Sequence, residues 1–255
     1  MLVTSQILRK YFGVRPTGVL HVGAHRAEEF DDYRSAGFGK TTWVEAQAEL
    51  IPVIRDRVSP SDDLVLQGVV WSVTGEKQQF QVASNGQSSS LYSMMKHSDY
   101  YPGITEVRSV EVTTVRLDAL IPSGTHFDFV NLDIQGAELE ALKGLGEMIR
   151  SVHWIYSEVN REMLYDGIPM VSELDDYLGT LGFRRRVTVW TNAGWGDALY
   201  SRGPIRLFEM ASFLLGLILV VWVPRFRGLE LLLYRFVWGP FFRLGSKMGL
   251  FRKET

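Results

Sequence analysis

The chain has 255 residues, of which 46% are apolar and 22% charged, and a formal net charge of −2. This length is sufficient for one α/β domain with a complete core and an appendage. Cysteine is absent, which excludes disulfides and thiolate metal sites. Nine basic but only three acidic residues lie from Arg202 onward, so residues 202–255 carry +6 and residues 1–201 carry −8. The acidic body argues against a nucleic-acid enzyme, because binding of phosphate backbones needs a basic face.

The N-terminal residues 1–14 lack the uninterrupted apolar core of a signal peptide. Arg9 and Lys10 stand where such a core would continue. We therefore expect the protein to face the cytoplasm.

A short apolar strand is predicted at residues 18–23, followed by a turn of small residues and a helical stretch to about residue 37. Gly23 and Ala24 form this turn, and small residues allow a ligand to lie close to the backbone. The next predicted strand, residues 41–45, ends on Glu45, 22 positions after Gly23. This spacing suits a carboxylate that accepts hydrogen bonds from ribose hydroxyls. Ala27 stands where another glycine would help a pyrophosphate approach, so the pattern favours a nucleoside cofactor smaller than a dinucleotide.

A third strand is predicted at residues 63–70. Between residues 78 and 115 the pattern changes to strand-like pieces and a polar loop at 85–90. This loop is suited to cover a bound ligand, and an ordinary surface loop is the alternative.

The most informative segment is residues 127–144. A nearly unbroken apolar strand at 127–133 stops at Asp133, and a helix follows with Leu139 and Leu142 at helical spacing. Ligands bind at the carboxyl edge of open α/β sheets, so Asp133 is well placed for chemistry. A helix N-cap is the alternative role of this acid.

Another strand, residues 152–158, ends on Glu158. His153 opens the same strand and should lie at the opposite edge of the sheet. A hairpin is predicted at 183–201, with its glycine-rich turn at 192–196.

These motifs together resemble the FkbM family of S-adenosylmethionine-dependent methyltransferases, from about residue 18 to residue 200. The string LDIQGAE at 132–138 with LKG at 142–144 is the specific part. The supporting motifs are VGA at 22–24, Glu45, SSSL at 88–91, RLD at 116–118, SEVN at 157–160 and LY at 164–165.

The resemblance implies a Rossmann-like class I methyltransferase sheet of seven strands, mostly parallel, with an antiparallel C-terminal hairpin. It also implies S-adenosylmethionine bound across the first strands and methyl transfer to oxygen, often a sugar hydroxyl. Asp133 and Glu158 are the candidate catalytic bases, and Asp133 also borders the cofactor. The other expected cofactor contacts are His21, Gly23, Ala24, His25, Glu45, Ala46, Gln67 and Gly68.

The family usually has Asp, Asn and Gly at the positions of His21, His25 and Ala27. The two histidines flank the turn and would replace the polar residues as hydrogen-bond donors, or merely fix the loop. A divalent metal held by Asp133, Glu138 and Glu158 is a less favoured use of the acids, because their spacing is not diagnostic.

The C-terminal part, residues 204–255, is predicted to be a separate apolar, basic, helical tail after a methyltransferase domain at 1–203. Its uncharged run, residues 210–224, would cover about 22 Å as a helix, short of the roughly 30 Å hydrocarbon core. After Pro224, apolar residues fall on one helical face, and aromatic and basic residues flank it. We therefore expect a re-entrant or in-plane membrane anchor, and burial against a partner or in an oligomer is the alternative.

The sequence thus predicts a sugar O-methyltransferase that acts on a glycan or glycolipid at the cytoplasmic face of a membrane. A non-catalytic module of the same fold, which binds partners or membrane through its tail, is the alternative.

Overall fold

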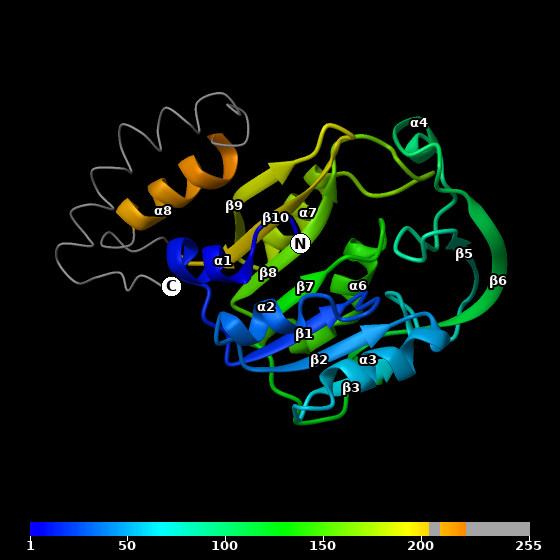
Figure 1. Cartoon of the computed structure of the whole chain (residues 1–255), viewed down its shortest axis with the longest axis horizontal. Coiled ribbons are helices and arrows are strands. Elements are labelled where there is room, and N and C mark those ends of the chain that lie inside the picture. Colours follow the sequence, from blue (N-terminus) through cyan, green and yellow to red (C-terminus); the bar gives the residue numbers. More distant parts are fainter. Residues whose placement is uncertain (204–209, 223–255) are drawn as a thin grey trace, which may run out of the picture.

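The computed structural model describes residues 1–203 and 210–222. Its centre is a seven-stranded sheet in the order β3-β2-β1-β7-β8-β10-β9 (Figure 1). Strand β10 runs antiparallel to both of its neighbours, and the other neighbouring pairs are parallel. This confirms the predicted Rossmann-like sheet and its C-terminal hairpin. The strands are β1 (Gly18–Val22), β2 (Lys40–Glu45), β3 (Leu64–Gln67), β7 (Phe129–Leu132), β8 (Trp154–Asn160), β9 (Phe183–Trp190) and β10 (Trp195–Arg202).

Helices cover both faces of this sheet, so its central strands are buried on both sides. This explains why β1 and β7 are apolar at most positions and do not alternate, with only His21 and Asn131 as buried polar residues. One face packs against α1 (Ser5–Phe12), α2 (Phe30–Ser35) and α3 (Ile51–Val58), which follows the short helix η1 (Ala48–Leu50). The other face packs against α5 (Leu117–Leu120), α6 (Glu138–Gly144), η2 (Gly146–Ser151) and α7 (Val171–Thr180).

The register between β1 and β7 places the two central strand ends side by side. Val22 pairs with Leu132, so Gly23 and Asp133 leave the sheet next to each other. The amide of Asp133 donates to the carbonyl of Val22 at 3.1 Å. The turn after β1 and the motif after β7 therefore share one edge of the sheet.

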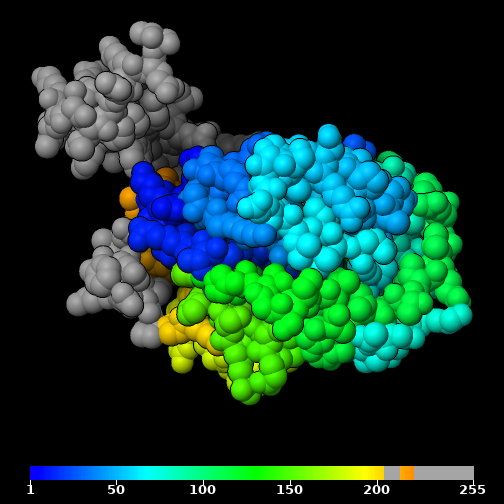
Figure 2. Space-filling model, turned by 90° about the horizontal axis from the view of Figure 1, so that it is seen from below, coloured from blue at the N-terminus to red at the C-terminus, as the bar shows by residue number. Residues whose placement is uncertain are grey.

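A separate three-stranded sheet, in the order β4-β6-β5, lies at the end of the molecule opposite α8 (Figures 1 and 2). It consists of β4 (Val69–Val70), β5 (Lys77–Ala83) and β6 (Glu106–Val115), and α4 (His97–Tyr100) lies in the segment between β5 and β6.

The prediction of one strand over residues 63–70 was wrong. The chain leaves the main sheet at Gly68, whose amide donates to the carbonyl of Glu45 at 2.9 Å, and then pairs with β6. A Cβ at Gly68 would lie 2.9 Å from the Leu120 side chain, so the chain is closely packed at the crossing. Both halves are apolar, and their pattern alone does not reveal that they belong to different sheets.

The C-terminal helix α8 (Met210–Leu217) continues into the π-helical η4 (Ile218–Trp222), which confirms a helix in this part of the predicted tail. It packs on α1, with the Phe12 and Phe213 rings 5.5 Å apart. A Cβ at Gly216 would lie 2.7 Å from the Cβ of Tyr11. No helix within residues 1–203 and 210–222 is long and apolar enough to cross a membrane. The predicted amphipathic segment after Pro224 lies outside the described residues.

Candidate active site

Two neighbouring cavities open at the carboxyl ends of β1, β2, β7 and β8, with volumes of about 320 and 60 Å³. They share four lining residues and therefore form two compartments of one cleft. The shared residues are Gly23, His25, Gln87 and Asp133. The cleft lies where ligands bind in open α/β sheets.

The smaller cavity combines apolar walls with one buried acid. Its apolar lining includes Val69, Phe80, Ile134 and Ala137. At its polar end, the Glu45 carboxylate accepts hydrogen bonds from the amides of His25 and Gln47, at 2.7 and 2.9 Å. Burial raises the pKa of Glu45 above its ordinary value. The apolar walls suit a flat ring, and the Glu45 carboxylate suits a neighbouring group of the same ligand that carries a pair of hydroxyls.

The turn after β1 is tightly wound against β2 and β7. The amides of Gly23 and Ala24 donate to the carbonyl of Val44 at 2.9 and 3.0 Å. Gly23 has φ 87°, and a Cβ there would lie 1.9 Å from the carbonyl oxygen of Asp133. His25 and Ala27 are also left-handed, with φ 44° and 53°. Only glycine fits at position 23, because any Cβ there would collide with the backbone of Asp133.

The two histidines of the turn both line the larger cavity and both bond within the protein. His21 is buried, its Nδ1 lies 3.0 Å from the Tyr33 hydroxyl, and burial lowers its pKa. His25 Nδ1 lies 2.7 Å from a Glu28 carboxylate oxygen. Their ring nitrogens fix the local structure of the turn, and both residues line the larger cavity.

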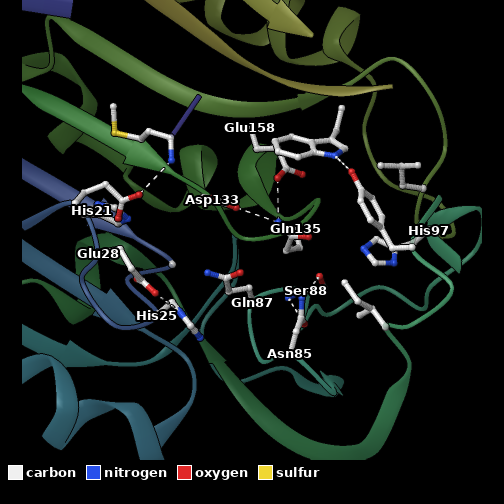
Figure 3. Close-up of a pocket in the computed structure, with 17 residues that line it drawn as sticks. His21, His25, Glu28, Asn85, Gln87, Ser88, His97, Asp133, Gln135 and Glu158 are labelled. Carbon is white, nitrogen blue, oxygen red and sulfur yellow. Dashed lines mark hydrogen bonds and ion pairs between the residues drawn. The ribbon is translucent and has the colours of Figure 1, made fainter. Parts of the chain in front are cut away.

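Asp133 and Glu158 are joined by the side chain of Gln135 (Figure 3). Gln135 Nε2 donates to Asp133 Oδ1 at 3.0 Å and to Glu158 Oε2 at 2.9 Å. The Tyr165 hydroxyl donates to Gln135 Oε1 at 2.7 Å, which fixes the amide with its nitrogen toward the acids. Strands β7 and β8 are neighbours, so the two predicted acids meet as expected.

The two acids of this group differ in exposure. Asp133 is exposed in the cleft, whereas Glu158 is 5% exposed. Burial raises the pKa of Glu158 well above its ordinary value, and the negative charges of Asp133 and Glu138 raise it further. Glu158 therefore holds its proton to a higher pH than an ordinary carboxyl group.

Glu138 does not line either cavity. Its carboxylate accepts hydrogen bonds from the amides of Ile134 and Gly136, at 2.9 and 3.0 Å, and so stabilises the turn after β7. Burial raises its pKa to about 7. Within residues 1–203 and 210–222, no three His, Asp or Glu side chains are grouped to hold a metal ion. The carboxylate that the metal alternative required is bonded to backbone instead.

Most of the predicted cofactor contacts line the cleft. His21 borders the larger cavity, Glu45, Ala46 and Gly68 border the smaller one, and Gly23 and His25 border both. Ala24 and Gln67 line neither. Ala24 is buried in the turn, and Gln67 is exposed at the end of β3, with its Nε2 donating to the Ala46 carbonyl at 3.1 Å. His153 also lies outside both cavities, directly before β8.

Several cleft residues were not predicted from the sequence. Gln135 lies inside the most specific motif, and that motif was the available signal. The polar loop at 85–90 does contribute lining residues, as expected of a ligand cover. No local pattern identified several others, among them Phe80, His97, Tyr101, Ile104 and Trp195.

The family model described as "Methyltransferase FkbM domain" matches residues 21–185, more than half of the chain. The chain belongs to the FkbM methyltransferase family. This FkbM protein is accordingly an S-adenosylmethionine-dependent methyltransferase, as its fold also indicates. No curated protein matches the sequence of the FkbM chain.

The solved structures that are similar to the FkbM chain include several methyltransferases of low sequence identity. Magnesium protoporphyrin IX methyltransferase (ChlM) from Synechocystis PCC 6803 with bound SAM is 9% identical, with a TM-score of 0.42, and the match covers 72% of this chain and 69% of that one. Ribosomal protein L11 methylase from Lactobacillus delbrueckii subsp. bulgaricus is 11% identical, with a TM-score of 0.44 and coverage of 78% and 76%. A SAM-dependent methyltransferase from Aquifex aeolicus is 16% identical, with a TM-score of 0.41 and coverage of 78% and 89%.

Proposed function

We propose that this protein transfers a methyl group to a sugar hydroxyl of a glycan or glycolipid at the cytoplasmic face of a membrane. The observation that carries the proposal is the pair of acids, Asp133 and Glu158, bridged by Gln135 beside the cofactor cleft. A hydroxyl group must lose its proton on methylation, and this pair offers a place for it.

The residues of the cleft fit S-adenosylmethionine. Glu45 would accept bonds from the ribose hydroxyls, since each of its oxygens has a lone pair left after the backbone bonds to His25 and Gln47. The apolar walls of the smaller cavity would hold the adenine, and the space above Gly23 would hold the methionine end. When bound, this cofactor supplies an electrophilic methyl group whose departure leaves a neutral thioether.

Glu158 is the favoured proton acceptor of the pair. Its raised pKa makes its ionised form a stronger base than an ordinary carboxylate. Gln135 and Tyr165 hold this carboxylate in place, so an acceptor oxygen between the two acids would lie within reach of the base. Asp133, exposed at the strand end, would orient the same hydroxyl.

The membrane part of the proposal rests on the C-terminal residues. Leu214 on α8 and Ile218 at the start of η4 are 52% and 50% exposed. The sequence beyond residue 222 is rich in apolar, aromatic and basic residues, which suits an anionic lipid surface. We test this with flotation of the full chain on phosphatidylglycerol vesicles. Loss of flotation is expected in the double variant Leu214→Glu, Ile218→Glu, and unchanged flotation would contradict a contact through α8.

The cofactor part is tested by calorimetry with the full chain and S-adenosylmethionine. We expect micromolar binding that Glu45→Ala abolishes. If the folded wild type does not bind, the alternative of a non-catalytic module that recruits partners or membrane through its tail is favoured.

The chemical part is tested by transfer of labelled methyl from S-adenosylmethionine to a glycan extract of membranes. We expect Glu158→Gln to bind the cofactor normally and to lose at least about 100-fold in transfer rate. Full transfer by this variant would exclude Glu158 as the base, and label recovered only on nitrogen would exclude O-methylation.

A further inference from the structure

The larger cavity extends past the cofactor contacts to a wall of aromatic and apolar side chains. This wall, which we call the aromatic wall, borders the larger cavity and not the smaller one. Its members are His97, Tyr101, Ile104, Leu164 and Trp195. In Figure 3, His97 lies on the far side of the cavity from His21 and His25.

The aromatic wall is built from three separate segments that are bonded to one another. Trp195, in the hairpin, donates from Nε1 to the Tyr101 hydroxyl at 2.9 Å. The His97 ring packs on Tyr101 and Tyr165, with centroids 5.0 and 5.4 Å apart. The amide of His97 donates to the carbonyl of Leu164 at 3.1 Å. The wall is therefore held in place by contacts within the protein itself.

Polar groups face this wall across the cavity. Asp133, Gln135 and Glu158 lie on one side, and the side chains of Asn85, Gln87 and Ser88 lie below them in Figure 3. His97 itself is 4% exposed, and its buried Nδ1 has no hydrogen-bond partner among residues 1–203 and 210–222.

The charge of the cavity restricts what can enter. Four carboxyl groups line it, from Glu28, Glu29, Asp133 and Glu158, and none of its described lining residues is Lys or Arg. The amino group of Met1 also borders it, but this group is paired with Glu29 at 3.1 Å. The methionine end of the cofactor carries an ammonium group beside its carboxylate, but a uronate or sugar phosphate brings no cation of its own. Such an acceptor would therefore meet repulsion from the acids that line the cavity.

We infer that the aromatic wall and Gln135 form an acceptor subsite for one uncharged hexopyranoside ring, and that the subsite excludes uronates and sugar phosphates. A pyranoside has apolar C–H faces, which suit Tyr101 and Trp195, and a rim of several hydroxyls, which suits the many polar groups opposite. A phenolic acceptor, with its single hydroxyl, would leave most of those polar groups without a hydrogen-bond partner. This inference rests on the proposed function and names the acceptor class of the same site.

The volume is consistent with a single ring. At about 320 Å³ the cavity is at the small end of the roughly 300–1,000 Å³ typical of small-molecule sites. It must also hold the methionine end of the cofactor, so a second sugar would lie outside.

The test is saturation-transfer NMR with the full chain in the presence of S-adenosylhomocysteine. The probes are neutral methyl pyranosides of the gluco, manno, galacto, rhamno and fuco series, and the methyl glucuronide and galacturonide that differ from two of them only at C6. At least one neutral probe should give ring C–H signals about five-fold stronger than either uronide. Equal signals from uronides, or no signal from any neutral probe when S-adenosylhomocysteine binds, would overturn the subsite and leave the proposed function standing.

Variants locate the binding. Trp195→Leu should lower the neutral-probe signal at least about five-fold, while Trp190→Leu, on the same hairpin but outside the cavity, should keep it. Tyr101→Leu serves as a second test if Trp195→Leu does not fold. An unchanged signal in the folded wall variants would refute the subsite, and failure of S-adenosylhomocysteine to bind the wild type would refute both this inference and the proposed function.

Discussion

Gln135 donates a hydrogen bond from its side-chain amide to the buried carboxylate of Glu158 at 2.9 Å, although the two residues come from different strand ends. Gln135 has φ 53°, a left-handed conformation that turns its side chain back over the sheet edge. The bond ties the turn after β7 to the end of β8.

We predict that Gln135→Leu lowers kcat for methyl transfer about 10-fold to 100-fold while calorimetric affinity for S-adenosylmethionine stays within about two-fold. The hydrogen bond from the Gln135 side-chain amide favours the ionised form of Glu158. Its loss should therefore also move the pH profile of kcat to higher pH. Tyr165→Phe, which only frees the amide to rotate, should show a smaller effect in the same direction. A lower kcat with an unmoved pH profile would mean that Gln135 acts on the fold alone.

Gly23→Ala should destabilise the protein and weaken cofactor binding. Its Cβ would lie 1.9 Å from the Asp133 carbonyl oxygen, so β1 and β7 would have to separate at the site. The control is Gly124→Ala, where φ is also positive, at 83°, but no atom lies within 4 Å of the new Cβ. We expect a loss of about 1–2 kcal/mol in the free energy of unfolding for Gly124→Ala and at least about 2 kcal/mol more for Gly23→Ala, measured by urea denaturation. Equal losses of unfolding free energy in the two variants would show that the close approach of Gly23 to Asp133 does not require glycine.

Ala27 adopts a left-handed conformation, with φ 53°, where family members usually have glycine. Ala27→Gly relieves roughly 1–2 kcal/mol of backbone strain, which offsets the loss of a buried methyl and the greater freedom of the unfolded chain. The free energy of unfolding should therefore stay within about 0.5 kcal/mol of wild type. Ala24→Gly, at a buried position without positive φ, should lower it by about 1–2 kcal/mol. If the two variants lose the same amount, the turn is not strained at Ala27.

Glu138 should make stability depend on pH. Its pKa is about 7 in the folded protein against an ordinary value of 4.5, so the folded state holds a proton that the unfolded state releases between these values. Stability conferred by this proton is present below about pH 4.5 and is lost as pH rises to about 7, amounting to roughly 3 kcal/mol. Glu138→Gln lacks this titration. Urea denaturation at pH 5 and pH 8 should show wild type losing about 2–3 kcal/mol relative to the variant, and a constant difference between them would contradict the shifted pKa.

The sequence determined the central sheet because each of its strands carries its own signal. The apolar runs at β1 and β7, and the hairpin with its glycine-rich turn, are local patterns that no distant contact has to complete. Parallel strands present their carboxyl ends at one edge, so the positions of Gly23, Glu45, Asp133 and Glu158 at strand ends were enough to place them in one cleft. The division of residues 63–70 between two sheets could not be predicted from the sequence, because both pieces are apolar and only the pairing of β4 with β6 separates them.

Only the tertiary structure showed which residues form the far side of the cleft and which of its acids are exposed. The aromatic wall joins His97, Tyr101 and Trp195 from segments that are distant in sequence, and no spacing rule predicts such a meeting. Glu138 and Glu158 both belong to motifs at strand ends, but one bonds backbone amides and the other faces the cavity. Residue type fixes what a side chain can do chemically, whereas burial and neighbours fix its pKa and its access to a ligand, and these depend on the packing of the whole domain.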